Sequence, residues 1–325
     1  MGNAKRFALA VLMTGLAGLT GCVTSPASSP APTHPGQRQL TQGVELFAED
    51  NYPLAAERFQ QALDYFRSVD DPTGIVDSRI NLLETALRVG NLAAARRQLE
   101  QARRVANRAD LQPRLQRLSL LAARLLAADN QAAEASKRLD ELLKQSPLDT
   151  ELQLSALAWR AELAIRSAPA QAEPWLARYA EAIDRAKDPA ATHKARVVRL
   201  RADQARALNA GAMADQAYRR ALTGFRQARY RPGLATTLQN WAALALTQGE
   251  HTQARNRVQR ALYIRLWMLD RPGAIAAFQT WAAIETGAGA PKQAAAARAW
   301  ARHLEQTDKI DWEAVKQAVE GARLD

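Results

Sequence analysis

Small and apolar residues recur along the chain with a period of about 40 residues, beginning near Leu40. In six of the seven periods, a marker residue is followed four positions later by an apolar or aromatic residue, with Arg298 in the seventh, and three positions after that by alanine, with Leu142 in the third. These spacings place the three residues on one stripe of a helix. The marker stands at seven places, and it is small at all but the fourth: Ala55, Ala95, Ala135, Trp175, Ala214, Ala254 and Ala294.

A second helix is expected before each stripe. In three units it is framed by glycines at the same spacing, over residues 74–90, 233–249 and 273–289. Proline and glycine between the units, as in Arg231-Pro232-Gly233, stop one helix and start the next. Each unit is therefore predicted to be a helical hairpin, and the chain to be all-α. The fourth unit contains Pro169 and Pro174, so a kink or an altered hairpin is expected there.

This pattern resembles the tetratricopeptide repeat family in its longer form, over about residues 40–302. The resemblance implies a right-handed superhelical solenoid of about seven helix-turn-helix units, with a C-terminal capping helix. A fused pair of ordinary helical bundles is the alternative. Besides the stripe, the resemblance rests on a small residue late in the first helix, and on glycine or asparagine in the hairpin turn. The first set is Leu83, Ala123, Ala202, Ala242 and Ala282, and the second is Gly90, Asn130, Asn209, Gly249 and Gly289.

The N-terminus has the pattern of a secretory signal peptide. A short positive segment precedes an apolar stretch, residues 7–19, that is too short to span a bilayer. Leu19-Thr20-Gly21-Cys22 resembles the bacterial lipobox, which implies a lipid on the sulfur of Cys22 and cleavage before it. Cys22 is the only cysteine, so no internal disulfide can form. By the same resemblance, Val23 in place of aspartate implies an outer-membrane lipoprotein facing the periplasm.

Three regions are predicted from these patterns. Residues 1–21 are the signal peptide, and residues 22–39 are the lipidated cysteine with a proline- and serine-rich linker. This linker has too few apolar residues to offset the conformational entropy that it would lose on ordering. Residues 40–325 form the solenoid and its capping helix.

Catalytic chemistry is not predicted. No metal-ligand spacing, phosphate-binding loop, nucleophile elbow or dinucleotide motif occurs, so neither an enzyme nor a cofactor nor a metal site is expected. His34 lies in the predicted linker, and the other three histidines are isolated from one another and are predicted to lie on the surface: His193, His251 and His303.

The formal net charge is +11, and arginines gather in residues 88–124 and 194–231. A nucleic-acid partner would fit such charge, but an outer-membrane lipoprotein would not meet one. Periplasmic or outer-membrane proteins, through acidic segments, and anionic lipids are the compatible partners. Solvated helix faces without a binding role are the alternative explanation. In the family, the first helix of each unit lines the concave face, and this register gives a predicted binding set: Asn81, Arg117, Arg124, Arg196, Arg199, Arg206, Gln239 and Asn240.

The resemblance implies a periplasmic protein-protein interaction scaffold or adaptor for an envelope machine. Pilus or secretin assembly, outer-membrane protein assembly, and peptidoglycan synthesis or hydrolysis are such machines. The alternative is a structural lipoprotein that binds the cell wall or an anionic glycolipid. The oligomeric state stays open.

Overall fold

The computed structural model describes residues 34–307 and 310–321, and within these ranges the secondary structure is helical with no strand. Fifteen α-helices and one 3-10 turn follow one another in chain order. They are α1 (Pro35–Ala48), α2 (Tyr52–Ser68), α3 (Pro72–Val89), α4 (Leu92–Arg108), α5 (Gln112–Ala128), α6 (Ala132–Leu142), α7 (Thr150–Ser167), η1 (Pro169–Gln171), α8 (Glu173–Arg185), α9 (Ala191–Ala207), α10 (Gly211–Gln227), α11 (Arg231–Thr247), α12 (His251–Trp267), α13 (Arg271–Gly287), α14 (Pro291–Gln306) and α15 (Trp312–Gly321).

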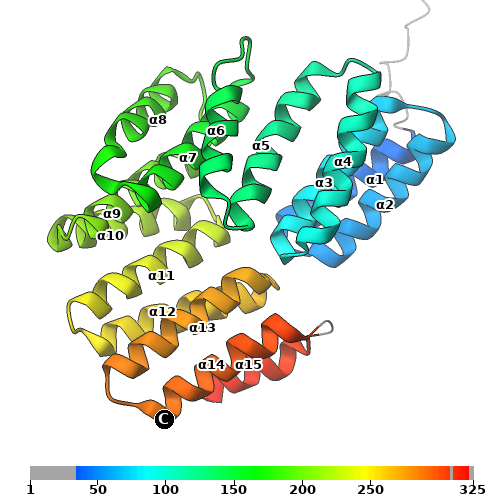
Figure 1. The fold of residues 1–325 in the computed structure, drawn as a ribbon. Coiled ribbons are helices and arrows are strands. Elements are labelled where there is room, and N and C mark those ends of the chain that lie inside the picture. Colours follow the sequence, from blue (N-terminus) through cyan, green and yellow to red (C-terminus); the bar gives the residue numbers. More distant parts are fainter. Residues whose placement is uncertain (1–33, 308–309, 322–325) are drawn as a thin grey trace, which may run out of the picture. The chain divides into compact units, whose positions relative to one another are not determined.

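The helices pair as seven stacked hairpins, from α1 with α2 to α13 with α14, and the hairpins follow one another around a curve (Figure 1). This arrangement confirms the predicted all-α solenoid. The last helix, α15, contacts α12 and buries Val315 and Val319 in the core of the final units.

The array begins earlier than predicted. Helix α1 starts at Pro35 rather than at Leu40, so the end of the predicted linker is helical. Proline is compatible with a first helical turn, and Gly36 is buried where a Cβ would meet the rings of Tyr65 and Phe66. The predicted signal peptide and Cys22 lie outside the described residues.

The marker residues form the interfaces between helices. All six marker alanines are buried, because a small side chain lets two helix backbones approach closely. In the fourth unit, Trp175 is only half-buried, and Ala172 and Leu176 are buried instead. The turn η1 precedes α8 there, which confirms the predicted altered hairpin. In the last unit, the stripe shifts from the exposed Arg298 to the buried Ala297.

The hairpin turns have the expected backbone. The five predicted turn residues have positive φ values, for example 77° at Gly90 and 60° at Asn130. Glycine and asparagine tolerate this left-handed conformation better than other residues do.

The first hairpins contact the sixth and seventh, which the sequence pattern did not predict. Arg231, at the start of α11, forms an ion pair with Asp50 at 2.9 Å. Tyr230 accepts a hydrogen bond from Arg88 of α3 at 3.5 Å, and α3 also contacts α13. At Gly90, an added Cβ would lie 2.6 Å from Pro272, so the two segments touch. These contacts connect the early hairpins with the late ones, so the solenoid closes on itself. The first helix of each hairpin in units two to six faces a central space.

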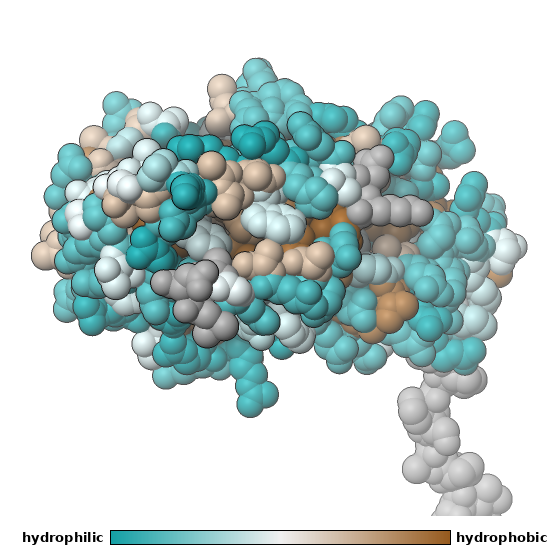
Figure 2. All heavy atoms as spheres, turned by 90° about the horizontal axis from the view of Figure 1, so that it is seen from below, coloured by the Kyte–Doolittle hydropathy of each residue, from teal (hydrophilic) through white to brown (hydrophobic). Residues whose placement is uncertain are grey.

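The face of the molecule shown in Figure 2 is mostly hydrophilic, with apolar side chains gathered near its middle. None of the helices in the described ranges combines the length and apolar character needed to cross a bilayer.

Candidate functional site: an arginine-lined cavity

A cavity of about 610 Å³ lies between the first helices of units two to six. Helices α3, α5, α7, α9 and α11 supply most of its wall, and α12 adds Arg265. Six arginines line the cavity against four carboxylates. The arginines are Arg88, Arg117, Arg124, Arg196, Arg199 and Arg265, and the acids are Glu84, Asp149, Glu151 and Glu162.

Four of the predicted binding residues meet in this cavity. Arg117 and Arg124 come from α5, and Arg196 and Arg199 come from α9. Their spacings of seven and three keep each pair on one face of its helix. The helix positions that line the concave face in the tetratricopeptide family therefore include four residues that meet in this cavity.

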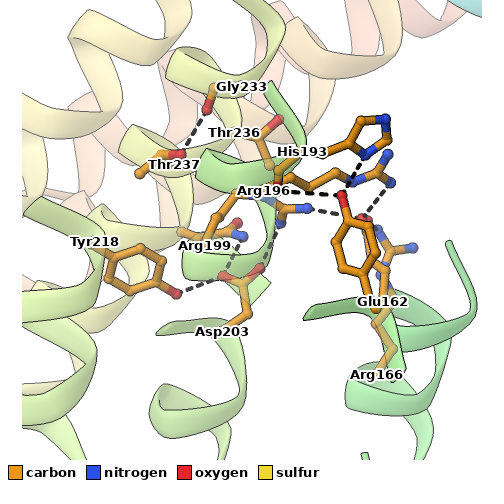
Figure 3. Close-up of polar contacts among 12 residues, drawn as sticks. Glu162, Arg166, His193, Arg196, Arg199, Asp203, Tyr218, Gly233, Thr236 and Thr237 are labelled. Atoms are coloured by element: carbon orange, nitrogen blue, oxygen red, sulfur yellow. Dashed lines mark hydrogen bonds and ion pairs between the residues drawn. The ribbon is translucent and has the colours of Figure 1, made fainter. Parts of the chain in front are cut away.

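Glu162 of α7 is the main anionic group of the cavity wall, and its contacts are drawn in Figure 3. It lies 2.9 Å from Arg199, 2.9 Å from Arg166 and 3.4 Å from Arg196. Burial alone would raise the pKa of the Glu162 carboxyl, but Arg199, Arg196 and Arg166 together outweigh burial and lower it to about 2. The Glu162 carboxylate is therefore held ionised and fully engaged by arginines.

Arg199 is not available to a partner, in contrast to the prediction. Its guanidinium is buried between Glu162 and Asp203, and it donates to Asp203 at 2.6 Å (Figure 3). Asp203 also accepts from Tyr218 at 2.7 Å and from Asn240 at 2.8 Å. The side chains of Arg199 and Asn240 thus satisfy a buried carboxylate between α9, α10 and α11, which is a structural role.

The remaining predicted residues lie apart from the cavity. Gln239 donates to Thr280 of α13 at 3.4 Å, and Arg206 is half-buried at the end of α9, outside the cavity lining. Asn81 donates to the backbone carbonyl of Asp77. It lines a neighbouring groove of about 530 Å³ between α1, α3 and α5, which shares Arg117 with the cavity.

Aromatic groups lie among the arginines of the cavity. The guanidinium carbons of Arg124 and Arg196 lie 5.6 and 5.3 Å from the centre of the Trp159 ring, within the range of cation-π attraction. Tyr230 contacts Arg88. Burial raises the pKa of the Tyr230 phenol, but Arg88, Arg196 and Arg124 outweigh burial and lower it below its usual range. The cavity interior therefore has a positive potential.

One histidine prediction was wrong. His193 is buried, and its Nδ1 lies 2.6 Å from the hydroxyl of Tyr179 while its Nε2 lies 2.8 Å from Glu151. It joins α7, α8 and α9. Residue spacing could not reveal these partners, because Glu151 is far away along the chain. Among the described residues, no group of three or more histidine, cysteine, aspartate or glutamate side chains could hold a metal ion.

Sequence reasoning also missed Arg88, Trp159, Glu162 and Tyr230 as cavity residues. Arg88 lies four positions after Glu84 on the same helix face, so the register could have included it. Trp159 and Glu162 belong to the irregular fourth unit, for which no concave-face positions were predicted. Tyr230 reaches Arg88 only because the solenoid closes, and no local signal indicates that contact.

Comparisons with known proteins support the fold. A crystal structure of a tetratricopeptide repeat protein from Parabacteroides merdae ATCC 43184 matches with a TM-score of 0.50 and 14% sequence identity, over 88% of this chain and 98% of that chain. BtubC (BKLC) from P. vanneervenii has a TM-score of 0.45 and 19% identity, over 69% of this chain and 91% of its own. No protein-family model matches the sequence, and no curated protein matches it. The first likeness shows a tetratricopeptide-like helical solenoid.

Proposed function

We propose that the protein is a non-enzymatic scaffold of the bacterial envelope, anchored to the outer membrane by a lipid on Cys22. In this proposal it binds an acidic segment of a periplasmic or outer-membrane partner protein at the arginine-lined cavity. The observation that carries the proposal is the excess of arginines over carboxylates on the concave side of the first helices.

Two properties of the cavity support an acidic partner. Guanidinium groups bind carboxylates through two parallel hydrogen bonds, which gives both affinity and orientation. Arg117 remains half exposed, because its contact with Glu84 is long, at 3.5 Å, and Glu84 is shared with Arg124. Arg117 can therefore exchange this carboxylate for one from a partner.

The partner test uses charge reversal that leaves the two buried ion pairs of Arg199 in place. We expect Arg117→Glu with Arg196→Glu to abolish crosslinking of the partner in intact cells, because two cavity cations become anions. The matched control is Arg104→Glu with Arg219→Glu, which makes the same change in charge at two exposed arginines outside the cavity lining. Circular dichroism checks that both variants are folded. Equal recovery of the same partners by a folded cavity variant and by the control would refute the binding site.

A separate experiment tests the anchor. We expect the wild-type protein to incorporate labelled palmitate and to fractionate with outer membranes, and Cys22→Ser to lose both properties. Unchanged lipid labelling of Cys22→Ser would exclude lipid attachment at this residue, without bearing on the cavity.

A further inference from the structure

Arg88 has an unusual environment for a partly buried cation. Its guanidinium lies at the end of α3, 3.5 Å from the Tyr230 hydroxyl and 5.9 Å from the centre of the Phe47 ring. In the described part of the chain, no carboxylate lies within ion-pair distance of it. Its Nε is buried and has no hydrogen-bond acceptor. Buried donors in native proteins nearly always have a hydrogen-bond acceptor. The described part of the chain supplies no acceptor for this atom, which points to an acceptor on a bound ligand.

Arg124 of α5 is a second partly buried cation in the cavity wall. Its nearest carboxylate is Glu84 at 3.6 Å, which also serves Arg117 at 3.5 Å. The Nε of Arg124 is likewise buried without an acceptor. Burial lowers the pKa of the Arg124 guanidinium, and repulsion from Arg88 and Arg196 adds to this effect against the attraction of Glu84. Arg124 is therefore close enough to Arg88 and to Arg196 to be repelled by both.

The local charge does not balance. Glu84 is shared between Arg124 and Arg117, and Glu162 is shared among Arg196, Arg199 and Arg166. Burying a charge costs free energy unless an opposite charge lies beside it. The space lined by Arg88, Arg124, Arg196 and Tyr230 consequently suits a multiply charged anion.

We propose that this space is a binding site for a phosphate group, carried by a small soluble molecule or by a lipid headgroup. It lies deeper in the cavity than Arg117 and shares Arg196 with the partner site proposed above, but phosphate binding to the purified protein is tested without that partner. A phosphate group carries up to two charges and three terminal oxygens, so it can accept from several arginines and from the Tyr230 hydroxyl together. A carboxylate has only two oxygens and one charge.

Binding of phosphate also strengthens the closure of the solenoid. Arg88 belongs to the second hairpin, whereas Tyr230 precedes α11 of the sixth. A ligand held by both residues bridges the two segments that meet there. Because it binds only the closed, folded chain, it raises the thermal stability of the protein, and above its Kd this gain grows with the logarithm of the ligand concentration.

The test titrates the purified full chain, in detergent, with pyrophosphate, inorganic phosphate and citrate at constant ionic strength, and follows heat release and melting temperature. Vesicles containing phosphatidic acid form a further arm. We expect pyrophosphate or phosphate to bind and to raise the melting temperature if the source is soluble, and the vesicles to bind if the source is lipid. Citrate is expected to bind more weakly than pyrophosphate. Absence of binding in all phosphate arms, or citrate binding as tight as pyrophosphate, overturns the proposal.

The variants locate the site. Arg88→Gln should weaken phosphate binding at least about tenfold, because it removes a charged hydrogen-bond donor. The matched control, Arg104→Gln, makes the same charge change on the exposed face of α4 and should leave binding unchanged. Tyr230→Phe keeps the ring and removes only the hydroxyl, so it should weaken binding and lower the melting temperature without ligand only slightly, because the Arg88–Tyr230 hydrogen bond is long, at 3.5 Å. This second variant decides the question if Arg88→Gln does not fold. Equal affinities of the wild type, Tyr230→Phe and any folded Arg88→Gln contradict the assignment.

Discussion

The interfaces between helices and the central cavity are built in opposite ways. The interfaces repeat: a buried alanine such as Ala95 or Ala254 returns in nearly every unit and contacts residues close along the chain. The cavity does not repeat. Each unit supplies a different set of side chains to it, and Arg88 and Tyr230 meet across 142 positions of the sequence.

This difference separates the residues that maintain the fold from those available for binding. Nearest-neighbour packing of the units stabilises the solenoid as a sum of similar interfaces. Charged residues on the concave side do not take part in this packing, except where one of them pairs with a buried carboxylate. Arg199 is such an exception, since it lines the cavity and yet holds Glu162 and Asp203.

Arg199→Met should be the most destabilising change. It leaves two buried carboxylates without their shared cation, which costs about 3–5 kcal/mol of the free energy of unfolding. Arg166→Met is the matched control, because Arg166 also contacts Glu162 at 2.9 Å but its side chain is 62% exposed. The control should lose less than about 1 kcal/mol. Urea denaturation measures both, and similar losses would show that Arg199 has no special structural role.

Overpacking of a repeated interface should have a smaller effect. Ala254→Leu inserts a large side chain where the alanine is fully buried, so we expect a loss of about 1–3 kcal/mol. Ala288→Leu, at an exposed turn, should cost little. Thermal or urea unfolding of the two variants compares them directly. An equal loss at both positions would contradict the hairpin register.

The acid stability of the protein should depend on Glu162. Its pKa is about 2 in the folded chain and 4.5 ordinarily, so the unfolded chain binds more protons between these values. The stabilising contribution is therefore complete above pH 4.5 and declines as the pH falls toward 2. Glu162→Gln should be less stable than the wild type at neutral pH and should lose less stability over this window. Parallel pH profiles of the two proteins would exclude this role for Glu162.

The smallest effect is expected at the contact that closes the solenoid. Arg231→Gln removes the ion pair with Asp50, but the Arg231 side chain is 43% exposed and Asp50 still accepts from Tyr52 at 2.8 Å. We expect a loss below about 1 kcal/mol of global stability. Hydrogen exchange should nevertheless increase at the adjoining ends of α2 and α11. A uniform change over all helices would show that the contact is not a local closure.

Much of the fold could be predicted from sequence, because its determinants are local. Spacings of three and four residues identified the buried stripe, and glycine or asparagine marked turns that require a positive φ. The cavity was predicted only in part. Arg117 and Arg196 follow from helix register, but the burial of Arg199 depends on Glu162 in a unit with irregular spacing. The contact of Arg88 with Tyr230 depends on the curvature summed over several hairpins, which no single repeat specifies.

The most direct test of the account places a photo-crosslinking amino acid at one position in each region and identifies what it captures in intact cells. Ser155 lines the cavity, whereas Met213 lies outside the cavity lining on α10 with 69% of its surface exposed. We expect the residue at 155 to capture a specific partner through an acidic segment, and increasing salt to weaken this capture. We expect the residue at 213 not to capture the same partner. Capture of the same proteins at 213, or none at 155, would contradict the claim that the cavity is the binding site.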